Sequence, residues 1–285
     1  MLKHRLIFGS LMTVLFSSLV LFDGWLDGSL TASPEDNRQV QATLVALLVG
    51  VAAGLGGLEL ARLAASKGLV VLNPVCAVGV VLVSTSWWGA RLMHVPVSIY
   101  LPMATVLTLA GMMLWQQMRL GVNGVLANCG VSCFALLYLG LLGAFILAIR
   151  VDGGPLAFLT FVFVIKSSDI GAYTFGKLFG RHKLAPRVSP GKTWEGLGGA
   201  MVFAAVVSLA FAMISGIMGV WIAPVFGVVM AVVGQLSDLS ESMLKRDAQQ
   251  KDSSNRVPGF GGILDVIDSP LFAAPCAYLF LTALV

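Results

Sequence analysis

The sequence predicts an all-α, polytopic membrane protein with about nine transmembrane helices and a cytoplasmic N-terminus. Of its 285 residues, 58% are hydrophobic and 11% are charged, and the mean hydropathy is +0.91. Soluble domains carry about 25% charged residues, so this composition excludes an ordinary soluble fold. The charges are also gathered in a few polar segments between long apolar stretches, which is typical of a chain that crosses a bilayer repeatedly.

Nine apolar stretches are long enough to cross, or nearly cross, a hydrocarbon layer of about 30 Å. The first is longer than the apolar part of a signal peptide, so we expect it to be retained as a span. The stretches cover residues 6–22, 40–63, 69–88, 98–115, 125–149, 155–175, 194–214, 220–236 and 270–285. We expect two regions: helices 1–5 in residues 1–150, and residues 151–285, which carry polar loops at 177–193 and 237–269.

The positions of Lys and Arg predict the topology, because cytoplasmic loops are enriched in these residues. With the N-terminus inside, fourteen of the 18 lie in cytoplasmic segments. The opposite side holds only Arg38, Arg91 and Arg150, together with an acidic cluster at residues 23–36, while Lys166 lies within a span. This arrangement places both long polar loops on the cytoplasmic face.

The cysteines and the basic residues argue against a zinc site, a disulfide and a nucleic-acid partner. The four cysteines lie in apolar stretches without CxxC spacing or a nearby His, so we expect buried side chains rather than a zinc site or a disulfide. The Lys and Arg residues form no basic arm, so the sequence predicts no nucleic-acid partner.

The sixth apolar stretch carries polar residues on one helical face: Lys166, Asp169, Tyr173 and Lys177 follow one another at helical spacing. A charge at the centre of a bilayer costs about 2.5 to 3.5 kcal/mol, so such residues pair or line a polar cavity. One interpretation is an ion pair between Lys166 and Asp169 that only holds helices together. The other is that this face points at a functional site.

The loop at 177–193 ends in Ser189-Pro-Gly-Lys192-Thr193, directly before a predicted helix start at Trp194. The exposed N–H groups and dipole of a helix N-terminus attract phosphate, so Ser189, Lys192 and Thr193 are candidate phosphate ligands. Alternatively, the five cations of this loop serve membrane topology alone. We exclude a P-loop, because Pro186 replaces the required glycine and we expect no preceding β-strand.

The segment 237–269 holds six of the 14 acidic residues of the chain. Asp238, Glu241 and Lys245 share one face if the segment begins as a helix, and Asp265 and Asp268 are likewise three residues apart. Carboxylates at one place repel unless a cation joins them, and ligand sets made only of oxygen favour Mg²⁺. The alternative is a solvated run of charges.

A longer pattern in this segment identifies a family. The order S-x-x-K-R-x4-K-D, then a Pro-Gly-x-Gly-Gly turn and D-x-x-D, resembles the signature of phosphatidate cytidylyltransferases, also called CDP-diacylglycerol synthases. Residues 168–173 and 189–196 are similar to upstream motifs of the same family. The matching residues of the signature are Ser242, Lys245, Arg246, Lys251, Asp252, Pro258, Gly259, Gly261, Gly262, Asp265 and Asp268.

The resemblance implies a multi-pass enzyme of the inner, cytoplasmic membrane. It would transfer a cytidylyl group from CTP to phosphatidate in the lipid membrane and release diphosphate, with its active site on the cytoplasmic face. A homodimer is one assembly that it could form. The resemblance also implies that one or two divalent cations, expected to be Mg²⁺, bind Asp238, Asp265 and Asp268. The other catalytic residues implied are Lys251 and Asp252, and the substrate-binding residues are Ser189, Lys192, Thr193, Lys245, Arg246 and Asp169.

The sequence departs from the family pattern at two positions. Phe260 stands where the family typically has His, and Val266 stands where it typically has Arg. One alternative is therefore a divergent paralogue with reduced activity, with another lipid phosphate as substrate, or with a binding role alone. A further alternative is a transporter in which Lys166 and Asp169 line a permeation path.

Overall fold

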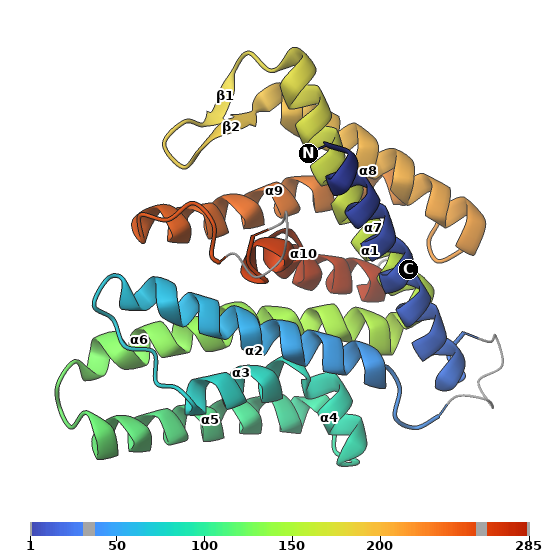
Figure 1. Ribbon diagram of the computed structural model, residues 1–285. Helices are drawn as coiled ribbons and strands as arrows, with labels where there is room; N and C mark the ends of the chain where they lie inside the picture. Colours follow the sequence, from blue (N-terminus) through green and yellow to red (C-terminus); the bar gives the residue numbers. More distant parts are fainter. Residues whose placement is uncertain (1, 31–37, 255–260, 284–285) are drawn as a thin grey trace.

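The computed structural model of the protein describes residues 2–30, 38–254 and 261–283, and almost all of its regular structure is helical (Figure 1). The expected fold class is therefore confirmed in that the protein is mostly helical. The elements in chain order are α1 (Leu2–Leu26), α2 (Thr43–Ala65), α3 (Val75–Ser84), α4 (Ser86–Leu92), α5 (Val97–Arg119), α6 (Val125–Ala135), the π-helix η2 (Leu136–Leu141), α7 (Leu142–Phe179), β1 (Lys183–Ala185), β2 (Ser189–Thr193), α8 (Trp194–Ser215), α9 (Ala223–Asp247) and α10 (Leu264–Ala283).

Among the described residues, seven helical segments are long and apolar enough to cross a membrane, and eight if the pair α3 and α4, bent by 76°, forms one span. The sequence predicts nine. The difference arises because two predicted spans, 125–149 and 155–175, are joined in one helical run, Val125–Phe179. A straight helix of its 55 residues would be about 80 Å long, far more than the thickness of a bilayer.

The helical run Val125–Phe179 is broken inside α7. Gly154 has φ 82° and ψ 177°, outside the helical region and accessible to glycine because it lacks a Cβ. Pro155 follows and has no N–H to continue the hydrogen-bond ladder. The first part of α7 consequently lies along α2, whereas the second part turns away toward the β1–β2 hairpin (Figure 1).

A buried ion triad ties three helices together near this break. The guanidinium of Arg150 is fully buried and donates to Asp23 and Asp27 at 2.8 and 2.9 Å. The same two carboxylates accept the N–H groups of Leu44 and Ala42 at the start of α2. Removing one partner of such a buried group leaves an uncompensated charge, so the triad fixes α1, α2 and α7 relative to one another.

Asp152, two residues after Arg150, joins further elements at the same end of the molecule. It accepts hydrogen bonds from Trp87 at 2.7 Å and from Tyr278 at 2.9 Å, and it pairs with Arg91 at 3.0 Å. The structure therefore gathers Arg91 and Arg150, which the sequence assigns to one side of the membrane, at one end of the fold.

The opposite end brings together the segments with the most Lys and Arg. Lys67, just after α2, forms an ion pair with Asp247 at the end of α9. Next to it, Arg246 donates to the carbonyl oxygen of Val188 in the hairpin. The C-terminal end of α9 and the hairpin accordingly lie on the same side of the molecule, at the left of Figure 1.

The hairpin corrects the expectation that no strand precedes Thr193. β1 and β2 are antiparallel, with Lys183 opposite Thr193 and Ala185 opposite Ser189. Both strands are short and carry few of the β-branched and aromatic residues that signal a strand. A two-stranded hairpin is only marginally stable alone, so its anchorage to α7, α8 and α9 makes this segment extended.

Glycines let α7, α8 and α9 approach closely, which positions the polar ends of α7 and α9. A Cβ at Gly171 of α7 would lie 2.5 Å from the carbonyl oxygen of Gly199 in α8. Likewise, a Cβ at Gly227 of α9 would lie 2.5 Å from the carbonyl oxygen of Ala204. Small residues of this kind are typical of helix contacts in membranes, where the helices pack backbone to backbone.

Candidate active site

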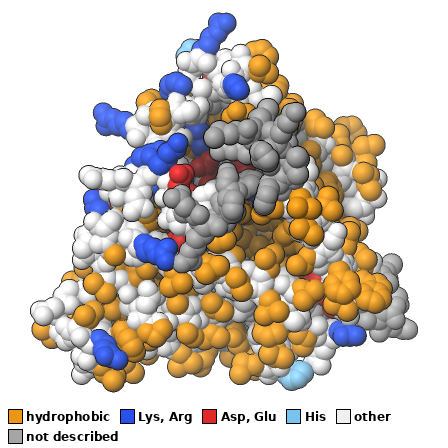
Figure 2. Space-filling model, in the orientation of Figure 1, with side chains coloured by type: hydrophobic (Ala, Val, Ile, Leu, Met, Phe, Trp, Pro, Cys, Tyr) orange, Lys and Arg blue, Asp and Glu red, His pale blue; other side chains and the backbone are white. Residues whose placement is uncertain are grey.

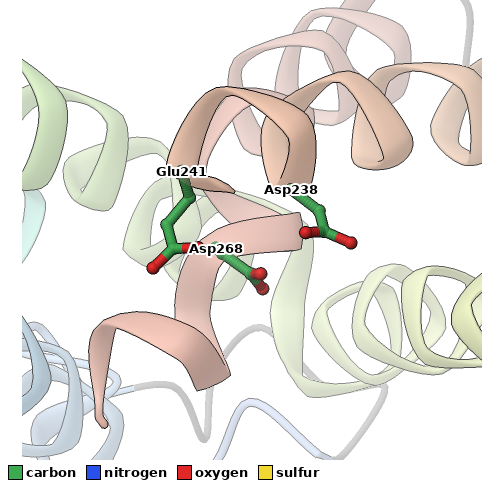
Figure 3. A group of neighbouring side chains, drawn as sticks. All are labelled: Asp238, Glu241 and Asp268. Carbon is green, nitrogen blue, oxygen red and sulfur yellow. The ribbon is translucent and has the colours of Figure 1, made fainter. Parts of the chain in front are cut away.

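Three carboxylates from two helices converge near the start of the second polar segment. Asp238 and Glu241 come from α9 and Asp268 comes from α10, and Figure 3 shows Asp268 between the other two. One oxygen from each lies within 4.8 Å of the others. Oxygens on opposite sides of one Mg²⁺ ion are about 4.2 Å apart, so small side-chain rotations would bring this acidic trio within reach of one ion.

The environment of Glu241 fits a cation. Its side chain is fully buried, and its Oε1 has no hydrogen-bond partner among the described residues, while Oε2 pairs with Lys245. A buried polar atom without a partner costs about 1 to 3 kcal/mol, and a charged one more. A divalent ion held with Asp238 and Asp268 would satisfy that atom, and the oxygen-only ligand set is the kind that Mg²⁺ prefers.

Lys192 brings the hairpin to the acidic trio. Its ammonium lies 2.7 Å from Oδ2 of Asp238 and donates to the carbonyl oxygen of Gln235 at 3.2 Å. The side chain is 15% exposed, so the ion pair is largely shielded from water. Of the three candidate phosphate ligands in the hairpin, Lys192 is the one that contacts the trio.

Asp265 does not join the acidic trio, although the resemblance implies that it binds metal with Asp238 and Asp268. Its Oδ1 pairs with Lys245 at 2.6 Å, and its Oδ2 accepts the N–H groups of Ser253 and Gly262 at 3.0 and 2.6 Å. Lys245 lies between Asp265 and Glu241 and pairs with both. Asp265 is therefore separated from the trio, although it shares a helix with Asp268.

Glu241 is the residue that completes the trio, and the sequence offered a signal for it. It lies three residues after Asp238 on the same helical face, at the spacing that also placed Lys245 there. The family pattern directed attention to the second acidic pair instead. Spacing within one helix accounts for Asp238 and Glu241 lying together, and which carboxylates bind metal stays a prediction.

Glu59 of α2 holds the start of α10 from the other half of the chain. It is fully buried and accepts the N–H groups of Ile263 and Leu264 at 3.2 and 2.9 Å, as well as the hydroxyl of Ser253 at 2.9 Å. A Cβ at Gly262 would lie 2.4 Å from Glu59 Oε2, so only glycine allows this approach. A lone acidic residue in an apolar span was the available signal, because such residues are expensive unless they have a role.

Two residues of the polar face of α7, Lys166 and Asp169, lie close to the same place. Lys166 and Asp169 form an ion pair at 3.5 Å, and Lys166 also donates to the carbonyl oxygen of Val266. The hydroxyl of Ser269 donates to Asp169, and the N–H of Ser269 donates to Asp268 at 2.6 Å. The pair therefore both holds α7 against α10 and lies next to the acidic trio.

The remaining hairpin candidates have structural contacts. Thr193 is buried and its hydroxyl accepts the N–H of Gly196 at 3.0 Å, which caps the N-terminus of α8. Ser189 is half-buried at the start of β2. The phosphate-binding expectation for these two residues stays a prediction.

The cationic and acidic residues after α9 lie further out. Arg246 donates to the carbonyl oxygens of Val188 and Gln250. Lys251 and Asp252 are exposed, and no hydrogen bond or ion pair joins them to the trio in the part of the chain that the structure describes. Phe260 lies outside the described residues, as do Pro258 and Gly259 of the signature.

One face of the molecule carries a charged region beside a hydrophobic one (Figure 2). Figure 2 shows acidic side chains among Lys and Arg side chains on the upper left of one face, next to a broad hydrophobic surface. Such a surface can face lipid tails while the charged region contacts water and headgroups. An arrangement of this kind suits a substrate that is itself half lipid and half anion.

Comparisons with known proteins show the family of the chain. A family model described as the cytidylyltransferase family matches residues 37–284. Over 129 residues the chain is 43% identical to a phosphatidate cytidylyltransferase of Brucella suis, covering 44% of the chain and 48% of that protein. Proteins with the same name are 41% identical over 155 residues in Bacillus subtilis, covering 53% of the chain and 58% of that protein, and 34% identical over 165 residues in Mycobacterium leprae, covering 57% and 53%.

The chain thus spans about half the length of the curated relatives it matches, whereas the family model covers most of the chain, including α2, which carries Glu59. Its apolar helices also make it a multi-pass membrane protein. The chain belongs to the cytidylyltransferase family.

Proposed function

We propose that this protein is a phosphatidate cytidylyltransferase, which converts CTP and phosphatidate to CDP-diacylglycerol and diphosphate. The observation that carries this proposal is the acidic trio with Lys192 paired to Asp238. Figure 2 also shows acidic and basic side chains beside a broad hydrophobic surface on one face of the molecule. The names of the Brucella, Bacillus and Mycobacterium relatives support the same reaction.

In the proposed reaction, a phosphate oxygen of phosphatidate attacks the α-phosphorus of CTP. The bond from that phosphorus to the oxygen bridging toward the β-phosphorus breaks, and diphosphate leaves. A phosphate monoester has a second pKa of about 6, so phosphatidate is largely a dianion at neutral pH and needs no strong base. The task of the protein is therefore to place two polyanions together and offset their charge.

We propose that Asp238, Glu241 and Asp268 hold the divalent cation, which we expect to be Mg²⁺. When bound, it would neutralise charge on the triphosphate and on the leaving diphosphate. The open, buried Oε1 of Glu241 supports this ligand set. Asp265 would serve the site by holding Lys245 beside Glu241.

The cations near the trio would bind phosphate groups. Lys192 is placed to donate to CTP, since its ammonium already lies against Asp238 and charge-assisted contacts are the stronger kind. Arg246 and Lys251 would add positive charge at the same end of α9. Asp169, through Ser269, would keep α10 and its Asp268 in position.

For the topology, we propose nine spans with a cytoplasmic N-terminus and the site at the cytoplasmic face of the inner membrane. Counting α3 with α4 as one span and dividing Val125–Phe179 at Gly154 gives nine from the described helices. The Lys67 to Asp247 pair at one end and the Arg91 to Asp152 pair at the other support this topology, because each joins segments assigned to one side.

The test is purified protein in detergent with phosphatidate, labelled CTP and Mg²⁺, assayed for label in the lipid fraction. We expect label that depends on phosphatidate and on Mg²⁺, and that is absent when a chelator is added. Folded protein that yields no lipid-linked label would contradict the proposal.

A further inference from the structure

A π-helix interrupts the long helical run at Leu136–Leu141 and carries Tyr138. π-helical turns are rare, and they occur frequently at functional sites because the extra residue changes which side chains face inward. Tyr138 is 3% exposed. The sequence gives no polar periodicity in this stretch, so nothing there marked Tyr138 in advance.

The ring of Tyr138 is well packed, but its hydroxyl is not satisfied. The ring stacks on Phe134 with centroids 5.4 Å apart and meets the edge of Phe272 at 5.8 Å. The buried hydroxyl has no hydrogen-bond partner among the described residues. Such a group costs about 1 to 3 kcal/mol, whereas Phe would keep the ring contacts without that cost. The hydroxyl therefore has no role in holding the described fold together.

The position of Tyr138 indicates what the hydroxyl faces. Phe272 lies one helical turn after Asp268 on α10, so the ring packs against the helix that carries one member of the acidic trio. The helix α9, which carries Asp238 and Glu241, packs against the same helix. The hydroxyl makes no hydrogen bond to any of the three carboxylates, which leaves it free to donate to something held by them.

We propose that Tyr138 is a positioning residue whose hydroxyl donates a hydrogen bond to an oxygen of the group bound at the acidic trio. With a cation bound, that oxygen would belong to a water before nucleotide binds and to a phosphate of CTP afterwards. The identification of the nucleotide as CTP rests on the proposed function, whereas the predicted effect of Tyr138 on cation binding does not. Two observations carry the proposal together: within the described residues, neither the buried hydroxyl of Tyr138 nor the buried Oε1 of Glu241 has a hydrogen-bond partner.

The test compares Tyr138→Phe with Tyr278→Phe as a matched control. Tyr278 lies on the same helix as Asp268, but its hydroxyl donates to Asp152 at the other end of the fold. We expect Tyr138→Phe to keep or raise the unfolding temperature and to weaken Mn²⁺ binding, followed by electron paramagnetic resonance without nucleotide, by about 10-fold or more. Tyr278→Phe should lower the unfolding temperature and leave Mn²⁺ affinity unchanged.

A second arm measures Mn²⁺ affinity and the KM for CTP with nucleotide present. If Tyr138→Phe weakens binding only when nucleotide is present, the hydrogen bond is to phosphate. If it weakens Mn²⁺ binding without nucleotide as well, the hydroxyl also bonds to water. Equal Mn²⁺ affinity and equal KM for CTP in Tyr138→Phe and wild type would overturn the proposal. If wild type forms no lipid-linked label yet Tyr138→Phe weakens Mn²⁺ binding, only the proposed function fails.

A readout in the wild-type protein uses fluorotyrosine at its four tyrosines, and Tyr138→Phe serves only to assign a resonance. Addition of Mg²⁺ should shift one fluorine resonance, the one that Tyr138→Phe removes. Four resonances unchanged by Mg²⁺ would count against the proposal independently of any folding defect.

Discussion

The Lys192 ammonium lies 2.7 Å from the Asp238 carboxylate, and this contact holds the hairpin between α7 and α8 against α9. Two segments more than forty residues apart in sequence thus meet at the acidic trio. The contact also keeps a cation beside carboxylates that would otherwise repel one another. Its consequences for substrate and metal binding can be measured separately.

Replacing Lys192 by Met should raise the KM for CTP by about 10-fold or more, because a hydrogen bond to a charged group contributes about 1.5 to 3 kcal/mol. Lys192→Arg should recover part of the loss, since it keeps the charge. The KM is measured with saturating phosphatidate. Lys183→Met, in the exposed part of β1, is the control and should leave the KM unchanged. An equal change in both Met variants would show that only the net charge of the hairpin matters.

Asp268→Asn should behave differently from Asp265→Asn. Removing the Asp268 carboxylate relieves repulsion within the trio and breaks no ion pair among the described residues, so the unfolding temperature should not fall, while metal-dependent transfer should fall by more than about 100-fold. Asp265→Asn breaks a pair with Lys245 and should lower the unfolding temperature. If Asp265→Asn keeps full thermal stability but abolishes Mn²⁺ binding, Asp265 is a ligand and the trio is misassigned.

Glu59→Gln should destabilise the protein although it lies far from α10 in sequence. Its carboxylate accepts hydrogen bonds from the N–H groups of Ile263 and Leu264, and an amide NH₂ in its place cannot accept. Each buried donor left without a partner costs about 1 to 3 kcal/mol. The measurement is the unfolding midpoint in detergent, with the exposed Asp247→Asn as control. Equal midpoints for the two variants would mean that Glu59 does not hold the start of α10.

Val266→Arg should increase transfer. Val266 is half-buried in the first turn of α10, one residue after Asp265, where the family typically has Arg. A guanidinium there can donate several hydrogen bonds to phosphate, which Val cannot do. We expect a gain of about 10-fold in kcat/KM. Val266→Met supplies length without charge and should give no gain, so similar rates in both variants would show that side-chain size is the limiting factor.

The main features of the fold could be predicted because hydrophobicity and charge act locally. Each predicted apolar stretch overlaps a helix, and the segments rich in Lys and Arg meet at one end. The hairpin was missed because contacts with α7, α8 and α9 override weak local signals in β1 and β2. The sequence also did not predict that the helix continues past Gly154, since Gly154 and Pro155 are typical of a loop between two helices.

The site was only partly predictable. Lys192, Asp238 and Asp268 follow from motif and spacing, and the structure brings them together. Glu59 and Tyr138 come from the first half of the chain, and their relation to α10 depends on tertiary packing that no pattern within one segment encodes. Long-range contacts of this kind can be read only from the folded chain.

The most direct test of the central claim is the location of a bound cation. Crystals grown with Mn²⁺ and measured at a wavelength sensitive to manganese would show its position by anomalous scattering. We expect one peak coordinated by Asp238, Glu241 and Asp268, which disappears in Asp268→Asn. A peak at Asp265, or no peak at the trio in protein that still transfers label to phosphatidate, would contradict the account.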